Sequence, residues 1–265
     1  MPGTSLAHFA RYRTHARVHC GWLEDDTLVR LDRPPWEGGR ATGHRDPLAR
    51  VKLLAPVLPG KIVCVGLNYR AHISESLSVL PGARPPREPL IFLKPPSAVI
   101  GPGAVIRYPV GVTRLDPEAE LAVVVGRRSS ALSPREASAV VAGLTCINDV
   151  TARNYQRDDG QWTRAKGFDT FAPLGPTVAV GLAPENLLVE CRVNGEARQR
   201  GNTSDLLFPV PVLVSHISRI MTLEPGDVIA TGTPAGVAPM VPGDRVAVEV
   251  QAIGVLENRV EKAAP

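Results

Sequence analysis

Short apolar runs, separated by turns that contain glycine and proline, dominate the chain from Lys61 onward. Runs of this kind, rich in valine and isoleucine, are typical of β-strands. The runs that predict strands are KIVCVGLNY, PLIFLKP, AVIGPGAVIRY, EAELAVVVG, LTCINDVT, PTVAVG, LLVECRVNG, DVIATGT, RVAVEVQAIG and LENRVEK. Pro-Gly-Asp turns at 225–227 and 242–244 separate late strands in the manner of hairpin or corner turns. So many short strands indicate a barrel or a rolled sheet.

Apolar residues at helical spacing are rarer and mark two segments. SPREASAVVAG at 133–143 opens on a Ser-Pro start and closes at a glycine, and the second segment is PVPVLVSHISRIM at 209–221. The first 57 residues read as short strands and turns with little core of their own, and the prolines of LLAPVLPG mark a boundary after them. We therefore predict a mainly β (α+β) fold with a few covering helices, divided into a small N-terminal domain at 1–57 and a larger domain at 58–265.

The composition is that of an ordinary globular protein, with 265 residues of which 44% are hydrophobic and 21% charged. The net charge of +4 comes from basic residues scattered singly, without a dense basic run, so we expect no nucleic-acid partner. The longest apolar run, at 139–147, is too short to span a bilayer, and no membrane partner is expected. The four cysteines lie far apart, which favours reduced thiols and a cytoplasmic location.

Acidic residues gather at the start of one predicted strand, in RLDPEAELAVVVG at 114–126. Alternate side chains of a strand point the same way, so Glu118 and Glu120 would share a face, where like charges resist ionising together. A third carboxylate, Asp149, follows another predicted strand. Such carboxylates without nearby His or Cys suit Mg²⁺, Mn²⁺ or Ca²⁺. The spacing alone favours a plain alternative, because E-x-E pairs are common in exposed strands. In that alternative Glu118 is a solvated edge residue, Glu120 pairs with an arginine and Asp149 is a helix cap.

Three further segments carry candidate chemistry. His72 and Glu75 stand at i, i+3, the same face of a short helix, where the carboxylate would hold the imidazole in one tautomer as a base. Lys166 in WTRAKGFDTF could stabilise negative charge on an enolate or carboxylate oxygen. ATGTPAGV at 230–237 could offer N–H groups and the Thr233 hydroxyl to an anion. The plain alternatives are a surface His–Glu pair, a solvated lysine and a simple turn.

Six segments, in order, resemble the fumarylacetoacetate hydrolase family: KIVCVGLNYRAHISES, PLIFLKPPSAVIGPG, RLDPEAELAVVVG, GLTCINDVTARNYQ, WTRAKGFDTFAPLGP and VIATGTPAGV. They cover essentially everything from Lys61 to Val260, and the N-terminal segment resembles the small domain that often precedes it. The resemblance implies a mixed β-roll and a homodimer. It also implies a Mg²⁺ or Mn²⁺ ion held by Glu118, Glu120 and Asp149.

The resemblance assigns roles to further side chains. The implied catalytic residues are His72, Glu75 and Lys166. The implied substrate contacts are Gln156, Gly232 and Thr233. Arg153 is expected to pair with a carboxylate and hold its helix in place, and the segment with Pro81, Gly82 and Pro85 is expected to act as a mobile flap.

The implied function is that of a divalent-metal-dependent enzyme acting on small 2-oxo or diketo acids through a metal-stabilised enolate. C–C hydrolysis, decarboxylation and keto–enol isomerisation, as in aromatic catabolism, all fit this chemistry and stay open. The types considered are an acylpyruvate hydrolase and a 2-hydroxyhepta-2,4-diene-1,7-dioate isomerase. A non-catalytic, metal-dependent scaffold or assembly protein is the alternative of a different class. A scaffold would need the three carboxylates but not His72, Glu75 and Lys166, which weighs against it.

Overall fold

The computed structural model describes residues 6–75 and 85–263, with only the backbone of residues 74 and 75 described. Three β-sheets form the framework of this part of the chain, and a few short helices cover them. The expected mainly β fold of the α+β class is thereby confirmed. The expected flap falls within residues 76–84 for the most part and so lies outside the described residues.

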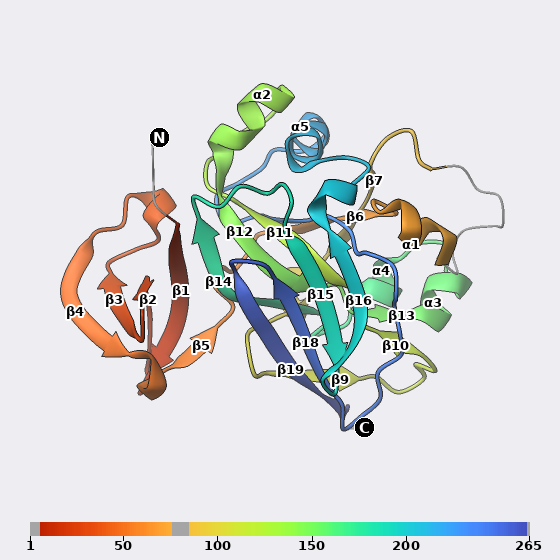
Figure 1. Cartoon of the computed structure of the whole chain (residues 1–265), viewed down its shortest axis with the longest axis horizontal. Coiled ribbons are helices and arrows are strands. Elements are labelled where there is room, and N and C mark those ends of the chain that lie inside the picture. Colours follow the sequence, from red (N-terminus) through yellow and green to blue (C-terminus); the bar gives the residue numbers. More distant parts are fainter. Residues whose placement is uncertain (1–5, 76–84, 264–265) are drawn as a thin grey trace.

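The large sheet extends through the whole molecule. Its strand order is β4-β3-β2-β1-β14-β12-β11-β17-β6-β7, with β5 paired to β1 and β8 to β14. The strands are β1 Ala7–Thr14, β2 Arg17–Glu24, β3 Thr27–Leu31, β4 Ala41–Pro47, β5 Lys52–Leu54, β6 Ile62–Gly66, β7 Leu90–Lys94, β8 Val99–Ile100, β11 Ala119–Val125, β12 Val141–Asn148, β14 Ala172–Val180 and β17 Val228–Ala230. Phe9 pairs with Val178, so the N-terminal strands join the main sheet through β1 and β14. Figure 1 shows β1 to β5 as a lobe beside the main body.

Two smaller sheets complete the β-structure. A five-stranded sheet has the order β16-β15-β18-β19-β9, and a two-stranded sheet joins β10 to β13. The strands are β9 Val105–Tyr108, β10 Leu115–Asp116, β13 Thr151–Ala152, β15 Leu188–Val193, β16 Glu196–Asn202, β18 Arg245–Val250 and β19 Gly254–Lys262. The five-stranded sheet packs against β11, β12 and β14 of the large sheet.

The helices are short and fall into two groups in space. The α-helices are α1 Arg70–Glu75, α2 Pro134–Ala137, α3 Arg153–Asp158, α4 Thr163–Lys166 and α5 Val210–Ile220. The 3₁₀ helices are η1 Pro35–Glu37, η2 Leu48–Arg50, η3 Pro96–Ala98, η4 Ser138–Val140 and η5 Thr203–Asp205. In Figure 1, α2 lies beside α5 at the top, while α1, α3 and α4 gather at the right. Even α5, the longest described helix with 11 residues, is too short to cross a bilayer.

Strand β11 is buried along its whole length, which explains its uninterrupted apolar run. Leu121 and Val123 lie in the core shared with the five-stranded sheet, whereas Ala122 and Val124 lie in a second core cluster on the opposite face. Because side chains alternate along a strand, Glu120 falls on the face of Ala122 and Val124. A charged group at this depth needs partner charges or hydrogen bonds, since burying it alone is costly.

One predicted helix is wrong in its extent, and one strand was not predicted. The segment expected to be helical over 133–143 leaves the helical conformation at Val140, and β12 begins at Val141. Pairing of β12 with β11, such as Leu144 with Val123, stabilises the extended conformation there. This pairing outweighs the preference for a helix that the spacing of the apolar residues indicates. The polar strand β16 carries no apolar alternation, and its position depends on pairing with β15.

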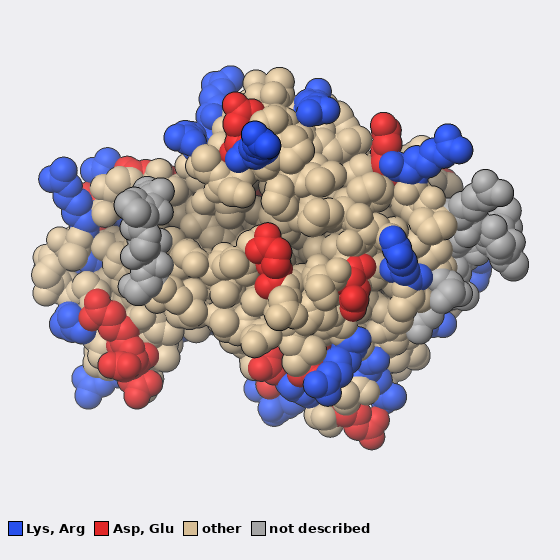
Figure 2. Space-filling model, turned by 45° about the horizontal axis from the view of Figure 1, so that its top comes forward, with Lys and Arg blue, Asp and Glu red and all other residues tan. Residues whose placement is uncertain are grey.

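Charged side chains are dispersed over the surface. On the face shown in Figure 2, lysine and arginine residues stand singly or beside acidic residues on a mostly uncharged surface. Several exposed charges of the described residues are paired, as Arg198 is with Glu196 at 2.8 Å. Exposed pairs of this kind contribute little to stability.

Candidate metal centre

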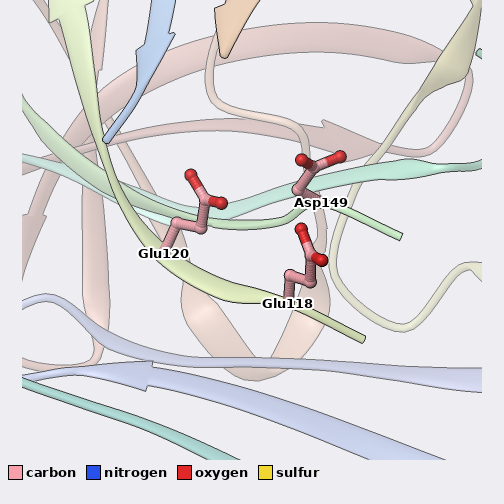
Figure 3. A group of neighbouring side chains, drawn as sticks. All are labelled: Glu118, Glu120 and Asp149. Carbon is pink, nitrogen blue, oxygen red and sulfur yellow. The ribbon is translucent and has the colours of Figure 1, made fainter. Parts of the chain in front are cut away.

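Three carboxylates meet where β11 begins and β12 ends. Glu118 stands just before β11, Glu120 lies within it, and Asp149 follows β12. The Asp149 N–H donates to the Glu118 carbonyl at 2.9 Å, and the Glu118 N–H donates to the Asn148 side-chain oxygen at 3.0 Å. These hydrogen bonds hold the two chain segments side by side, and Figure 3 shows the three carboxylate groups gathered together.

The cluster is compact and closed to solvent. One oxygen from each carboxylate lies within 4.8 Å of the others. Glu118 is 4% exposed, Glu120 2% and Asp149 1%. Three buried anions so close together repel one another and need positive charge among them. The face-sharing predicted for Glu118 and Glu120 is therefore seen in the structure, and the reading of Glu118 as a solvated edge residue is wrong.

Two lysines and an arginine supply positive charge to this cluster. The Lys166 ammonium lies 2.7 Å from both a Glu118 and an Asp149 oxygen. The Lys94 ammonium lies 2.6 Å from the other Asp149 oxygen, and the Arg153 guanidinium 2.6 Å from the second Glu118 oxygen. Every oxygen of Glu118 and Asp149 thus has a cationic partner.

Glu120 differs from its two neighbours because it forms no ion pair with another described residue. Its Oε2 accepts a hydrogen bond of 2.7 Å from the Gly232 N–H. Burial raises the pKa of Glu120 well above its usual range, and repulsion from Asp149 and Glu118 raises it further. Burial also acts to raise the pKa of Glu118, but Lys166 and Arg153 outweigh that effect and lower it. Glu120 is therefore the carboxyl group of this cluster that lacks a compensating cation among the described residues.

The loop after β17 is shaped around Glu120. Gly232 has a φ of +100°, and a Cβ at this position would lie 2.7 Å from the Asn68 Cβ. The Thr233 hydroxyl donates to the Ala119 carbonyl at 2.8 Å and accepts from the Gln199 amide at 2.7 Å. The Gly232 N–H and the Thr233 hydroxyl, both expected to contact substrate, here hold the loop against β11.

The other expected site residues lie around the same cavity. His72 of α1 is 6% exposed and lines the cavity together with Gln156 and Thr233. The Gln156 side-chain oxygen accepts from Arg153 at 2.8 Å. Arg153 pairs with carboxylates, as expected from the sequence. Glu75 ends α1, but its side chain lies outside the described residues, so its pairing with His72 stays a prediction.

Sequence reasoning missed Lys94 and did not identify the partners of Asp116. Lys94 is 1% exposed at the end of β7, and the only signal was a lysine closing the apolar run PLIFLKP. Asp116 belongs to the same acidic stretch but not to the cluster of Glu118, Glu120 and Asp149, and it is neutralised by Arg114 at 2.9 Å and Arg153 at 2.8 Å. Asp116 thus anchors Arg153, which in turn reaches Glu118.

Most of the chain matches known protein families. Residues 61–261 match the family Fumarylacetoacetate (FAA) hydrolase C-terminal, and residues 7–56 match Rv2993c-like, N-terminal. The structure is similar to 5-carboxymethyl-2-hydroxymuconate delta-isomerase from Mycobacterium smegmatis, with 41% identity, a TM-score of 0.89, and coverage of 97% of this chain and 100% of that one.

Two further similarities bear on chemistry. Maleylpyruvate hydrolase from Sphingobium sp. SYK-6, in complex with manganese (II) ion and pyruvate, has 28% identity, a TM-score of 0.78, and coverage of 97% and 100% of the two chains. Oxaloacetate tautomerase FAHD2A, mitochondrial, of Bos taurus is 43% identical over 227 residues, which are 81% of this chain and 71% of that protein. The chain therefore belongs to the fumarylacetoacetate hydrolase family, and the similar proteins named here are an isomerase, a hydrolase and a tautomerase.

Proposed function

We propose that this chain is an enzyme that binds Mg²⁺ or Mn²⁺ at Glu118, Glu120 and Asp149 and acts on small 2-oxo or diketo acids. The observation that carries the proposal is the buried carboxylate cluster, in which Glu120 has no cationic partner among the described residues. An all-oxygen ligand set of this charge suits a hard divalent cation. The similarity to a hydrolase whose structure contains manganese (II) and the 2-oxo acid pyruvate supports the same choice.

The metal ion and Lys166 have separate roles in this proposal. A divalent ion held by Glu118, Glu120 and Asp149 would supply Lewis-acid chemistry at the oxo group of the substrate. Burial acts to lower the pKa of Lys166, but Asp149 and Glu118 outweigh that effect and raise it to about 12. Lys166 therefore stays protonated at neutral pH and serves as a fixed positive charge beside the substrate, not as a base.

His72 is the residue to which we assign proton transfer. It lines the carboxylate cavity, and the ordinary pKa of histidine lies close to neutral pH. As a base it removes a proton from the carbon next to the oxo group, and as an acid it returns a proton at the other end of the enol system. Glu75 would orient the imidazole, in keeping with their spacing of three residues on α1.

Keto–enol isomerisation is the reaction that we favour. The relatives above 40% identity named here are an isomerase and a tautomerase. Isomerisation also requires the fewest catalytic groups, since it only moves a proton within the substrate. Hydrolysis of a C–C bond is the second candidate, supported by the similarity to maleylpyruvate hydrolase, and it additionally requires a positioned water.

The test is a substrate assay on protein stripped of metal and resupplied with Mg²⁺ or Mn²⁺. Oxaloacetate, 2-hydroxyhepta-2,4-dienedioate and a set of acylpyruvates are followed by enol absorbance and by product analysis. We expect metal-dependent tautomerisation that Glu120→Gln abolishes, while Glu261→Gln, at an exposed position of β19, keeps full activity. Metal-independent activity, or full activity of Glu120→Gln, would contradict the proposal. Tight metal binding without turnover of any substrate would instead support a scaffold role.

A further inference from the structure

The cavity at the carboxylates is too small to hold a whole substrate. It measures about 20 Å³ and is lined by residues such as Glu118, Glu120, Asp149 and Lys166. A cavity needs roughly 10–15 Å³ by such a measure to hold one water. Only an ion and the few atoms beside it fit here, so the rest of a 2-oxo acid has to extend elsewhere.

A larger groove opens next to this cavity. It measures about 470 Å³ and lies between β7, α3 and the loop that leads into α4. The residues that line it are Leu90, Ile91, Phe92, Gln156, Arg157, Gly160, Gln161 and Trp162. Phe92, Gln156 and Trp162 line both the cavity and the groove, so the two spaces adjoin at these side chains.

Phe92 and Trp162 form the partition between the two spaces. Their ring centroids lie 5.2 Å apart at an interplanar angle of 78°, an edge-to-face arrangement. The Lys166 ammonium lies 4.9 Å from the Phe92 ring centroid. Trp162 packs on Gly66, where a Cβ would come within 2.9 Å of the indole. The missing side chain at Gly66 is therefore what allows the indole to occupy this position.

One cationic side chain lines the groove. Arg157 is the only charged residue among its described lining residues, and the amides of Gln156 and Gln161 add hydrogen-bonding groups. The Arg157 guanidinium pairs with Asp158 at 3.1 Å, but both side chains are more than half exposed, at 66% and 53%. A pair of this kind is worth little, so a second carboxylate can engage Arg157 at small cost.

We propose that this groove binds the far end of the substrate and that Arg157 recognises a second carboxylate there. The substrate class is then an oxo-dicarboxylic acid, whose 2-oxo-acid end lies at Glu118, Glu120 and Asp149 and whose carbon chain passes the Phe92–Trp162 partition. This inference rests on the proposed function and adds to it a specificity-determining residue for the distal carboxylate.

Calorimetric binding of two six-carbon ligands tests the inference without turnover. In the presence of Mn²⁺, 2-oxoadipate has a distal carboxylate, whereas 2-oxohexanoate has a methyl group in its place. The parent should bind 2-oxoadipate more tightly. Arg157→Gln should weaken 2-oxoadipate binding about 10-fold, the lower end for a charge-assisted hydrogen bond, because the site is partly exposed. Its affinity for 2-oxohexanoate should not change.

Two further variants serve as controls. Arg198→Gln removes an exposed, ion-paired arginine on β16 and should leave both affinities at the parent value. Trp162→Ala should weaken both six-carbon ligands while leaving oxalate, which has no tail, unaffected. If Arg157→Gln changes both six-carbon ligands equally, or changes neither, the subsite assignment is wrong although the oxo-acid site stands. A parent that binds neither ligand with Mn²⁺ refutes the oxo-acid site and the subsite together.

Discussion

A methyl group added at Gly232 should damage both the fold and the metal centre. The φ of Gly232 is +100°, and a Cβ there would lie 2.7 Å from the Asn68 Cβ and 3.2 Å from the Val65 carbonyl oxygen. The backbone conformation costs an L side chain about 1–2 kcal/mol. Crowding in a packed interior adds about 1–3 kcal/mol. Gly232→Ala should therefore lower the free energy of unfolding by about 2–5 kcal/mol.

Gly243→Ala is the matched control for this prediction. Gly243 has a φ of +104°, and nothing lies within 4 Å of a Cβ built there, so its substitution carries the backbone cost alone. Urea denaturation of both variants separates crowding from backbone strain. Displacement of the Gly232 N–H should also cost Glu120 a hydrogen bond to a charged group, worth about 1.5–3 kcal/mol, and weaken Mn²⁺ binding about 10-fold or more. Equal stability losses in the two variants, with Mn²⁺ affinity intact in Gly232→Ala, would refute the reasoning.

Three other predictions address proton transfer, metal linkage and assembly. His72→Ala should lower turnover roughly 100-fold or more while metal affinity is kept, and undiminished turnover would exclude His72 as the base. Because burial and then repulsion from Asp149 and Glu118 raise the pKa of Glu120, Mn²⁺ binding should release a proton. Affinity should rise with pH below that pKa and level off above it, so calorimetry showing no proton release would contradict this linkage. Light scattering should give a mass near twice the 28.3 kDa of one chain, and a single-chain mass at all concentrations would rule out the proposed homodimer.

Strand geometry made part of the site predictable from sequence. Glu118 and Glu120 share a face because side chains alternate along an extended chain, and this follows from their spacing alone. The burial of β11 on both faces could also be expected, since its run of apolar residues is uninterrupted. Local pattern thus indicated one acidic face. It left open whether that face met solvent, an arginine or an ion.

The partners of these carboxylates could not be predicted in the same way. The Gly232 N–H reaches Glu120 across 112 positions of the chain, and Lys94 reaches Asp149 across 55. Such contacts depend on the pairing of β11 with β17 and on the position of β7, which no local pattern encodes. The helix predicted over 133–143 was too long for the same reason, because pairing with β11 places the residues from Val141 onward in β12.

The central claim is that Glu118, Glu120 and Asp149 hold one divalent ion. Crystals grown with Mn²⁺, measured at an X-ray energy at which manganese scatters anomalously, would locate the ion directly. The account predicts a strong anomalous peak between the three carboxylate groups, and loss of that peak in crystals of Glu120→Gln grown under the same conditions. A peak elsewhere, or no peak at these residues with Mn²⁺ in excess, would contradict it.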